Sequence, residues 1–72
     1  MGVKGEPLTP RERQVLRGVL EGHSNRDIAQ NLGTSLATVK AALRHLFDKT
    51  GVRTRSQLVG VAIERSLETS TR

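Results

Sequence analysis

Apolar residues recur at helical spacing in four separate segments of this chain of 72 residues. Within each segment they return every three or four residues, which places them on one face of a helix. The spacing predicts helices over about residues 10–21, 25–32, 36–49 and 55–67. The predicted fold class is therefore all-α, a four-helix bundle formed by residues 8–67. Residues 1–7 are expected to be a flexible tail or linker remnant, and residues 68–72 a second flexible tail.

Residues that favour helix ends bound these segments. Those that would cap the four helices are Thr9, Ser24, Ser35 and Thr54. Their side-chain oxygens can each accept a hydrogen bond from a free amide in the first turn, and Glu12 and Gln57 complete capping boxes. Gly33 ends the second segment, and two residues then separate it from the third. Such a short link forces the two helices to cross sharply, which predicts a helix-turn-helix over about residues 25–44.

The segment 36–49 combines an apolar face with a face of small and basic residues. One arc holds Leu36, Val39, Ala42, Leu43 and Leu46, and the opposite arc holds Ala37, Ala41, Arg44 and His45, with Lys40 on the flank. A solvated helix usually carries long charged side chains outside, whereas here two alanines lie beside cations. This arrangement favours close approach to a large polyanion, so we interpret the segment as a DNA-recognition helix.

Charge supports a nucleic-acid partner. Residues 35–57 hold five cations against Asp48 alone, a net +4 of the chain's +5. Such a patch favours nucleic acid through phosphate neutralisation and counterion release, although a solvated basic face is the competing interpretation. Phe47 is the only aromatic residue, so stacking on single strands is not expected and double-stranded DNA is favoured. We expect Phe47 at the edge of the core.

Several other functions find no support in the composition. The chain lacks cysteine, and its two histidines do not stand at a metal-ligand spacing with carboxylates, so no metal and no cofactor are expected. No nucleophile–base pair, carboxylate dyad or phosphate loop can be assembled, so an enzyme is not expected. No apolar run approaches the roughly 20 residues that span a bilayer, and no signal peptide is visible. We therefore expect a soluble, cytoplasmic protein.

Three motifs resemble the LuxR/FixJ/NarL-type (GerE-like) helix-turn-helix domain, which many response regulators carry at the C-terminus. They span residues 8–16, 22–29 and 35–40, and Val52, Arg55 and Val59 also match. The resemblance implies sequence-specific binding of double-stranded DNA for transcription regulation, with the third helix in the major groove. It also implies a two-fold homodimer through residues 55–67. RNA polymerase and an N-terminal receiver or ligand-binding domain are further possible partners.

The resemblance and the chemistry of the side chains together indicate which residues would contact DNA. Arginine and lysine can donate to guanine O6 and N7, and the resemblance implies base contacts at Lys40, Ala41 and Arg44. Contacts from hydroxyls, amides and cations to phosphates fix the register of a protein on the duplex. The candidates for such contacts here are Asn25, Arg26, Ser35, Thr38, His45, Lys49, Thr54 and Arg55. Arg55 could instead form a structural pair with Glu12 or Asp27.

The last segment supplies the candidate dimer face, which comprises Gln57, Gly60, Val61 and Glu64. A glycine inside a helix costs about 0.5–1 kcal/mol relative to alanine, and close approach of a second helix would explain Gly60 beside an outward Val61. A tolerated glycine and one exposed valine are the alternative. The stripe expected to face inward comprises Leu58, Val59, Ala62, Ile63 and Ser66.

Departures from the family pattern leave a second function open. Thr34, Ala42, His45 and Thr50 stand where relatives usually carry other residues, so a site preference cannot be borrowed. The alternative is a protein-interaction module with the same fold that has lost DNA binding. It predicts no salt-dependent binding to a duplex.

Overall fold

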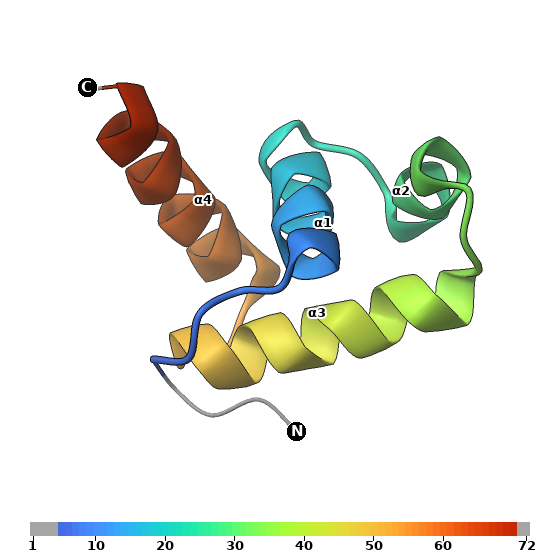
Figure 1. The fold of residues 1–72 in the computed structure, drawn as a ribbon, viewed down its shortest axis with the longest axis horizontal. Coiled ribbons are helices and arrows are strands. Elements are labelled where there is room, and N and C mark those ends of the chain that lie inside the picture. The colour runs from blue at the N-terminus through green and yellow to red at the C-terminus, as the bar shows by residue number, and fades with distance from the viewer. Residues whose placement is uncertain (1–4, 71–72) are drawn as a thin grey trace.

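The computed structural model describes residues 5–70, with side chains through Ser66. Its helices are α1 (Pro10–Leu20), α2 (Asn25–Leu32), α3 (Leu36–Thr50) and α4 (Arg55–Ser70), and no strand occurs among the described residues (Figure 1). The predicted all-α class and all four helices are confirmed. Helix α4 continues three residues beyond its predicted end, so residues 68–70 are helical where a tail was expected. Residues 1–4 and 71–72 of the two predicted tails lie outside the described residues.

The helix ends follow the local capping signals. Glu12 N donates to Thr9 Oγ1 at 3.1 Å, and Thr9 N donates to Glu12 Oε1 at 3.0 Å, which completes the predicted capping box of α1. Ser24 and Ser35 each accept a hydrogen bond from the amide three residues on, at 3.1 Å. Gly33 ends α2 in the left-handed conformation, with φ of 66°, which a side chain would strain. The α2–α3 link is therefore a tight turn.

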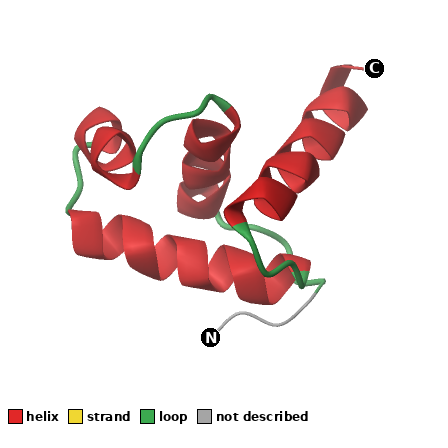
Figure 2. Ribbon diagram, turned by 180° about the vertical axis from the view of Figure 1, so that it is seen from behind, coloured by secondary structure: helices red, strands yellow, loops and turns green. Residues whose placement is uncertain are grey.

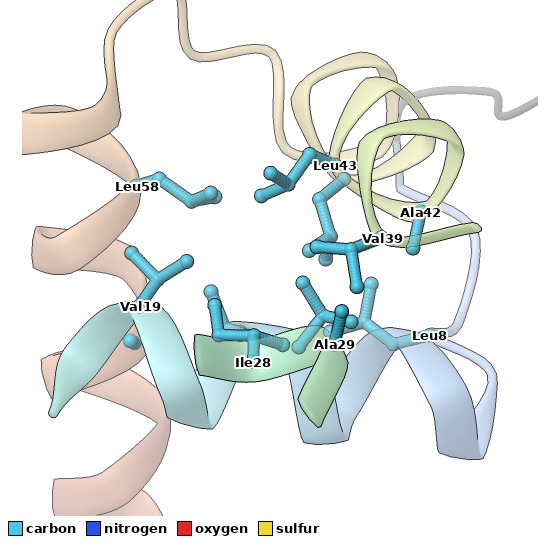
Figure 3. Packing of buried hydrophobic residues seen from close by; sticks show 12 residues of the cluster. Leu8, Val19, Ile28, Ala29, Val39, Ala42, Leu43 and Leu58 are labelled. Atoms are coloured by element: carbon cyan, nitrogen blue, oxygen red, sulfur yellow. The ribbon is translucent and has the colours of Figure 1, made fainter. Parts of the chain in front are cut away.

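Helix α1 lies at the centre and contacts each of the other three helices. In Figure 3 the side chains of Val19, Ile28, Val39 and Leu58 converge on one interior, each from a different helix. The buried apolar residues are Leu8, Val15, Leu16, Val19, Ile28, Ala29, Val39, Ala42, Leu43, Leu46, Leu58 and Ala62. Phe47 packs at their edge, as predicted. Removal of these apolar side chains from water is the main force that holds the helices together.

The contact between α1 and α2 depends on one glycine. A Cβ atom built on Gly18 would lie 2.6 Å from Ile28 Cγ1, closer than carbon atoms approach without repulsion. Gly18 therefore lets Ile28, which is fully buried, pack directly on the backbone of α1. This contact sets how closely the first helix of the helix-turn-helix approaches the centre of the domain.

Four residues do not face as the sequence predicts. Leu36 is 37% exposed because it begins α3, at the edge of the buried arc. Ile63 is 45% exposed and Ser66 is also exposed, because α4 is buried along a narrow stripe centred on Leu58 and Ala62. Val61 was expected to point outward, but it is half-buried and lines a hollow with residues of the segment before α1.

Candidate nucleic-acid interface

Helix α3 lies along one edge of the molecule, and the other three helices all lie on the same side of α3 (Figures 1 and 2). Val39, Ala42, Leu43 and Leu46 are buried and hold α3 to the core. The face turned away from the core exposes Ala37, Lys40 and Arg44. Among the described residues no other helix covers this face, so a duplex groove can receive it.

The two cations proposed to read bases are exposed and unpaired. Lys40 and Arg44 stand one turn apart on α3, and neither forms a hydrogen bond or ion pair with any described residue. Ala41 is half-buried beside them. Two unpaired cations with small neighbours present positive charge without a bulky side chain in front of it. This arrangement suits hydrogen-bond acceptors on the edge of a base pair.

Two hydroxyls meet at the start of α3. Ser35 Oγ accepts from Thr38 N and lies 2.9 Å from Thr38 Oγ1, and both residues are exposed. One hydroxyl donates to the other, so one hydroxyl hydrogen is left to donate outward. Together with the positive end of the helix dipole, this hydrogen makes the start of α3 suitable for a phosphate oxygen.

A second group joins the starts of α2 and α4. Arg55 Nη1 donates to Asn25 Oδ1 at 2.7 Å, and Arg55 Nη2 donates to the carbonyl oxygen of His23 at 2.9 Å. The alternative that Arg55 pairs with Glu12 or Asp27 is therefore wrong. Because Asn25 Oδ1 is engaged, its amide presents the Nδ2 hydrogens as donors. Arg26 lies beside it, exposed and without a partner among the described residues.

Lys49 and His45, which sequence reasoning assigned to phosphates, both lie against Glu12. Lys49 Nζ donates to Glu12 Oε1 at 2.7 Å and to the carbonyl oxygen of Pro7 at 3.1 Å. The side chains of Lys49 and Glu12 are 9% and 5% exposed. His45 Nδ1 lies 3.6 Å from Glu12 Oε2, with 40% of its side chain exposed. Lys49 therefore links the end of α3 to α1. Its ammonium group is nearly buried, whereas the side chain of Lys40 is exposed to solvent.

Glu12 is held as a carboxylate by these neighbours. Burial by itself would raise its pKa, but the hydrogen bonds from Lys49 and the Thr9 amide, with the charges of Lys49 and His45, outweigh burial. The pKa of Glu12 therefore lies below its ordinary value. The sequence indicated a capping role for Glu12 and offered Arg55 as a partner, but it did not indicate Lys49, which is 37 residues away along the chain.

The residues of the predicted dimer face on α4 have different surroundings within the domain: Gln57, Gly60 and Glu64 are exposed and Val61 is half-buried. Gln57 Oε1 accepts from Thr54 N at 3.2 Å, and Thr54 Oγ1 accepts from Gln57 N at 3.1 Å, so both side chains serve the predicted capping box. Val61 and Glu64 line the hollow beside residues 5–8. The open part of α4 instead carries Val59, Gly60 and Ile63; of these, Val59 is partly buried and a Cβ on Gly60 would meet nothing within 4 Å.

Among the described residues, neither a metal site nor a membrane-spanning helix is found. From residue 5 to residue 70, no three histidine, cysteine or acidic side chains gather where they could hold a metal ion. Over the same part of the chain, no helix combines the length and the hydropathy needed to cross a bilayer.

Comparison with known proteins identifies relatives over most of the chain. A family model described as "Bacterial regulatory proteins, luxR family" matches residues 6–62. A Mycobacterium bovis protein whose name describes an HTH-type transcriptional regulator is 50% identical over 58 residues, which are 81% of this chain and 7% of that protein. Transcriptional regulatory protein MctR of Rhizobium johnstonii is 37% identical, over 86% of this chain and 29% of its own. Response regulator Rre1 of Synechocystis is 42% identical, over 83% and 26%.

The chain thus spans less than a third of the length of each of these relatives. No solved structure matches it.

Proposed function

Since the chain belongs to the luxR family of bacterial regulatory proteins, which regulate transcription through a DNA-binding helix-turn-helix, we propose that it binds a specific sequence by laying α3 in the major groove. The observation that supports this most directly is that Lys40 and Arg44 are exposed on α3 and pair with none of the residues that the structure describes. These two side chains read base edges, with Ala41 giving clearance. The hydroxyls of Ser35 and Thr38 contact a phosphate at the start of the helix.

Further backbone contacts come from the group at the start of α2. Asn25, oriented by Arg55, donates to a phosphate through Nδ2, and Arg26 adds charge beside it. Thr54, His45 and Lys49 are secondary, because each already contacts another protein group. Phosphate contacts of this kind fix register and orientation but carry no sequence information.

We also propose that two copies bind together through α4. The apolar face of Val59, Gly60 and Ile63 is the best surface for this, because it is open and Gly60 permits close approach of a second helix. Gln57, Val61 and Glu64 take part at most at its margin. Two α3 helices related by a two-fold axis would read half-sites about one helical turn apart.

The wider setting follows from the family. We propose a cytoplasmic regulator without enzymatic activity, which acts on RNA polymerase and responds through a receiver or ligand-binding domain in the same protein. The name of Rre1, a response regulator, supports the receiver domain as one such arrangement.

The test is selection of duplexes from a random pool, followed by titration of the enriched sequence at two salt concentrations. Lys40→Ala and Arg44→Ala should each weaken binding by about 1–3 kcal/mol and broaden the selected sequence. Arg17→Ala is the matched control, because it removes the same charge from the exposed side of α1. Equal binding and equal selectivity in all three variants would contradict the groove assignment. Failure to bind any duplex at low salt would favour the protein-interaction alternative.

A further inference from the structure

Leu36 is a large apolar side chain that the domain leaves partly exposed. It is 37% exposed, and with Ile63 it makes up the exposed large apolar residues of the described part of the chain. Single exposed leucines are ordinary on protein surfaces. Leu36 differs by its position, because it is the first residue of α3, at the edge of the buried arc and one helical turn before the exposed Lys40.

Leu36, Lys40 and Arg44 form one row along α3. They are spaced by four residues, so each lies almost directly above the last on the helix surface. From Leu36 to Arg44 the helix rises by about 12 Å, at roughly 1.5 Å per residue. This length corresponds to about three to four stacked base pairs, at roughly 3.4 Å each. Neighbouring members of the row stand about 6 Å apart, so the row presents an apolar group and then two cations at intervals of nearly two base pairs.

Leu36 contributes less to the core than the buried residues of α3 do. Leu36 lies outside the buried cluster, and the first turn of α3 is capped by Ser35 and not by any contact of Leu36. On the edge of a duplex groove, the apolar group available to such a side chain is the C5-methyl group of thymine.

We propose that Leu36 is a specificity-determining residue that packs on a thymine methyl group, at the end of the half-site whose guanines Lys40 and Arg44 read. The inference rests on the proposed function, since it requires α3 in the major groove. It adds to that function a base preference: each half-site contains a thymine within about three to four base pairs of the guanine contacted by Arg44.

The experiment uses the duplex enriched by selection and replaces each thymine in turn by deoxyuridine, which removes only the C5-methyl group. For the unmodified protein, one position in each half-site should lose about fourfold in affinity, the value expected for one buried methyl group. Leu36→Ala should bind the parent duplex more weakly by at least the same factor and should lose its sensitivity at that position. Leu36→Met, which keeps an apolar side chain of similar volume, should retain that sensitivity.

The matched control is Lys40→Ala, which weakens binding but should still respond to the same deoxyuridine. Thermal unfolding of Leu36→Ala should match the unmodified protein, so a binding change cannot be attributed to misfolding. If no deoxyuridine substitution changes affinity while Lys40→Ala and Arg44→Ala do, the role of Leu36 is refuted and the proposed function stands. If Leu36→Ala keeps the full deoxyuridine effect, the contact belongs to another residue. If the protein binds no duplex, both proposals fail together.

Discussion

Removal of the Lys49 ammonium should destabilise the domain more than removal of any exposed charge. Lys49→Met keeps the apolar stem of the side chain and deletes the group that lies 2.7 Å from Glu12 Oε1. The carboxylate left behind is 5% exposed, so water cannot replace the lost partner easily. Deleting one partner of a buried ion pair typically costs about 3–5 kcal/mol.

The magnitude here should lie at or below the lower end of that range. Glu12 keeps the hydrogen bond from Thr9 N and the neighbouring His45, so we expect a loss of about 2–3 kcal/mol. A chain of this length is typically stable by about 4–11 kcal/mol. The loss is therefore a large fraction of the total, and the melting temperature should fall by roughly 10–20 °C.

The assay is urea unfolding at pH 7, followed by circular dichroism, with the double variant Lys49→Met/Glu12→Gln as the comparison. Glutamine removes the stranded charge and can still accept from the Thr9 amide in a capping box. The double variant should therefore be more stable than Lys49→Met alone. The reasoning is refuted if Lys49→Met lies within about 0.5 kcal/mol of the unmodified protein, the range of an ordinary surface substitution. It is also refuted if the double variant is the less stable of the two.

Three further predictions concern acid, packing and assembly. Because the pKa of Glu12 is lowered on folding, its stabilisation is present above the ordinary value of 4.5 and is lost as pH falls through the folded value. The stability difference between the unmodified protein and Glu12→Gln should therefore shrink on acidification in urea titrations, and a constant difference would contradict the assignment. Gly18→Ala should cost about 1–2 kcal/mol through its clash with Ile28, whereas Gly60→Ala, in open space, should stabilise by about 0.5–1 kcal/mol. If the two alanine variants unfold at the same urea concentration, the close α1–α2 contact is not as described. Ile63→Lys should weaken binding to a duplex with two half-sites but not to one with a single half-site, as measured by gel shift; equal losses on both would exclude α4 as the dimer face.

Helix positions and caps were predictable because their signals are local. Thr9 with Glu12 and Thr54 with Gln57 meet within one turn, so their spacing along the chain is also their spacing in space. The position of Gly33 likewise determined the tight turn, since the left-handed conformation at the end of α2 favours glycine.

The direction in which each side chain points, and the residues that it contacts, were harder to predict. Both depend on which helix or segment covers which face of a helix. A helical wheel gives Ile63 an inward place, but α4 is buried along too narrow a stripe to include it. Val61 was placed outward because nothing in the spacing shows that residues 5–8 pass beside it. The partners of Lys49 and Arg55 are 37 and 30 residues away, and pairs this distant leave no periodic trace in the sequence.

The distance between Glu12 and Lys49 along the chain has a consequence for folding kinetics. Their pair, 37 residues apart along the chain, closes a loop that contains most of α1, all of α2 and most of α3. A contact across such a loop forms only after the chain between its ends has been ordered, so we expect it to be absent from the transition state. Interactions of that kind act on the rate of unfolding rather than of folding. This pair would then extend the lifetime of the folded helix-turn-helix without changing how fast it forms.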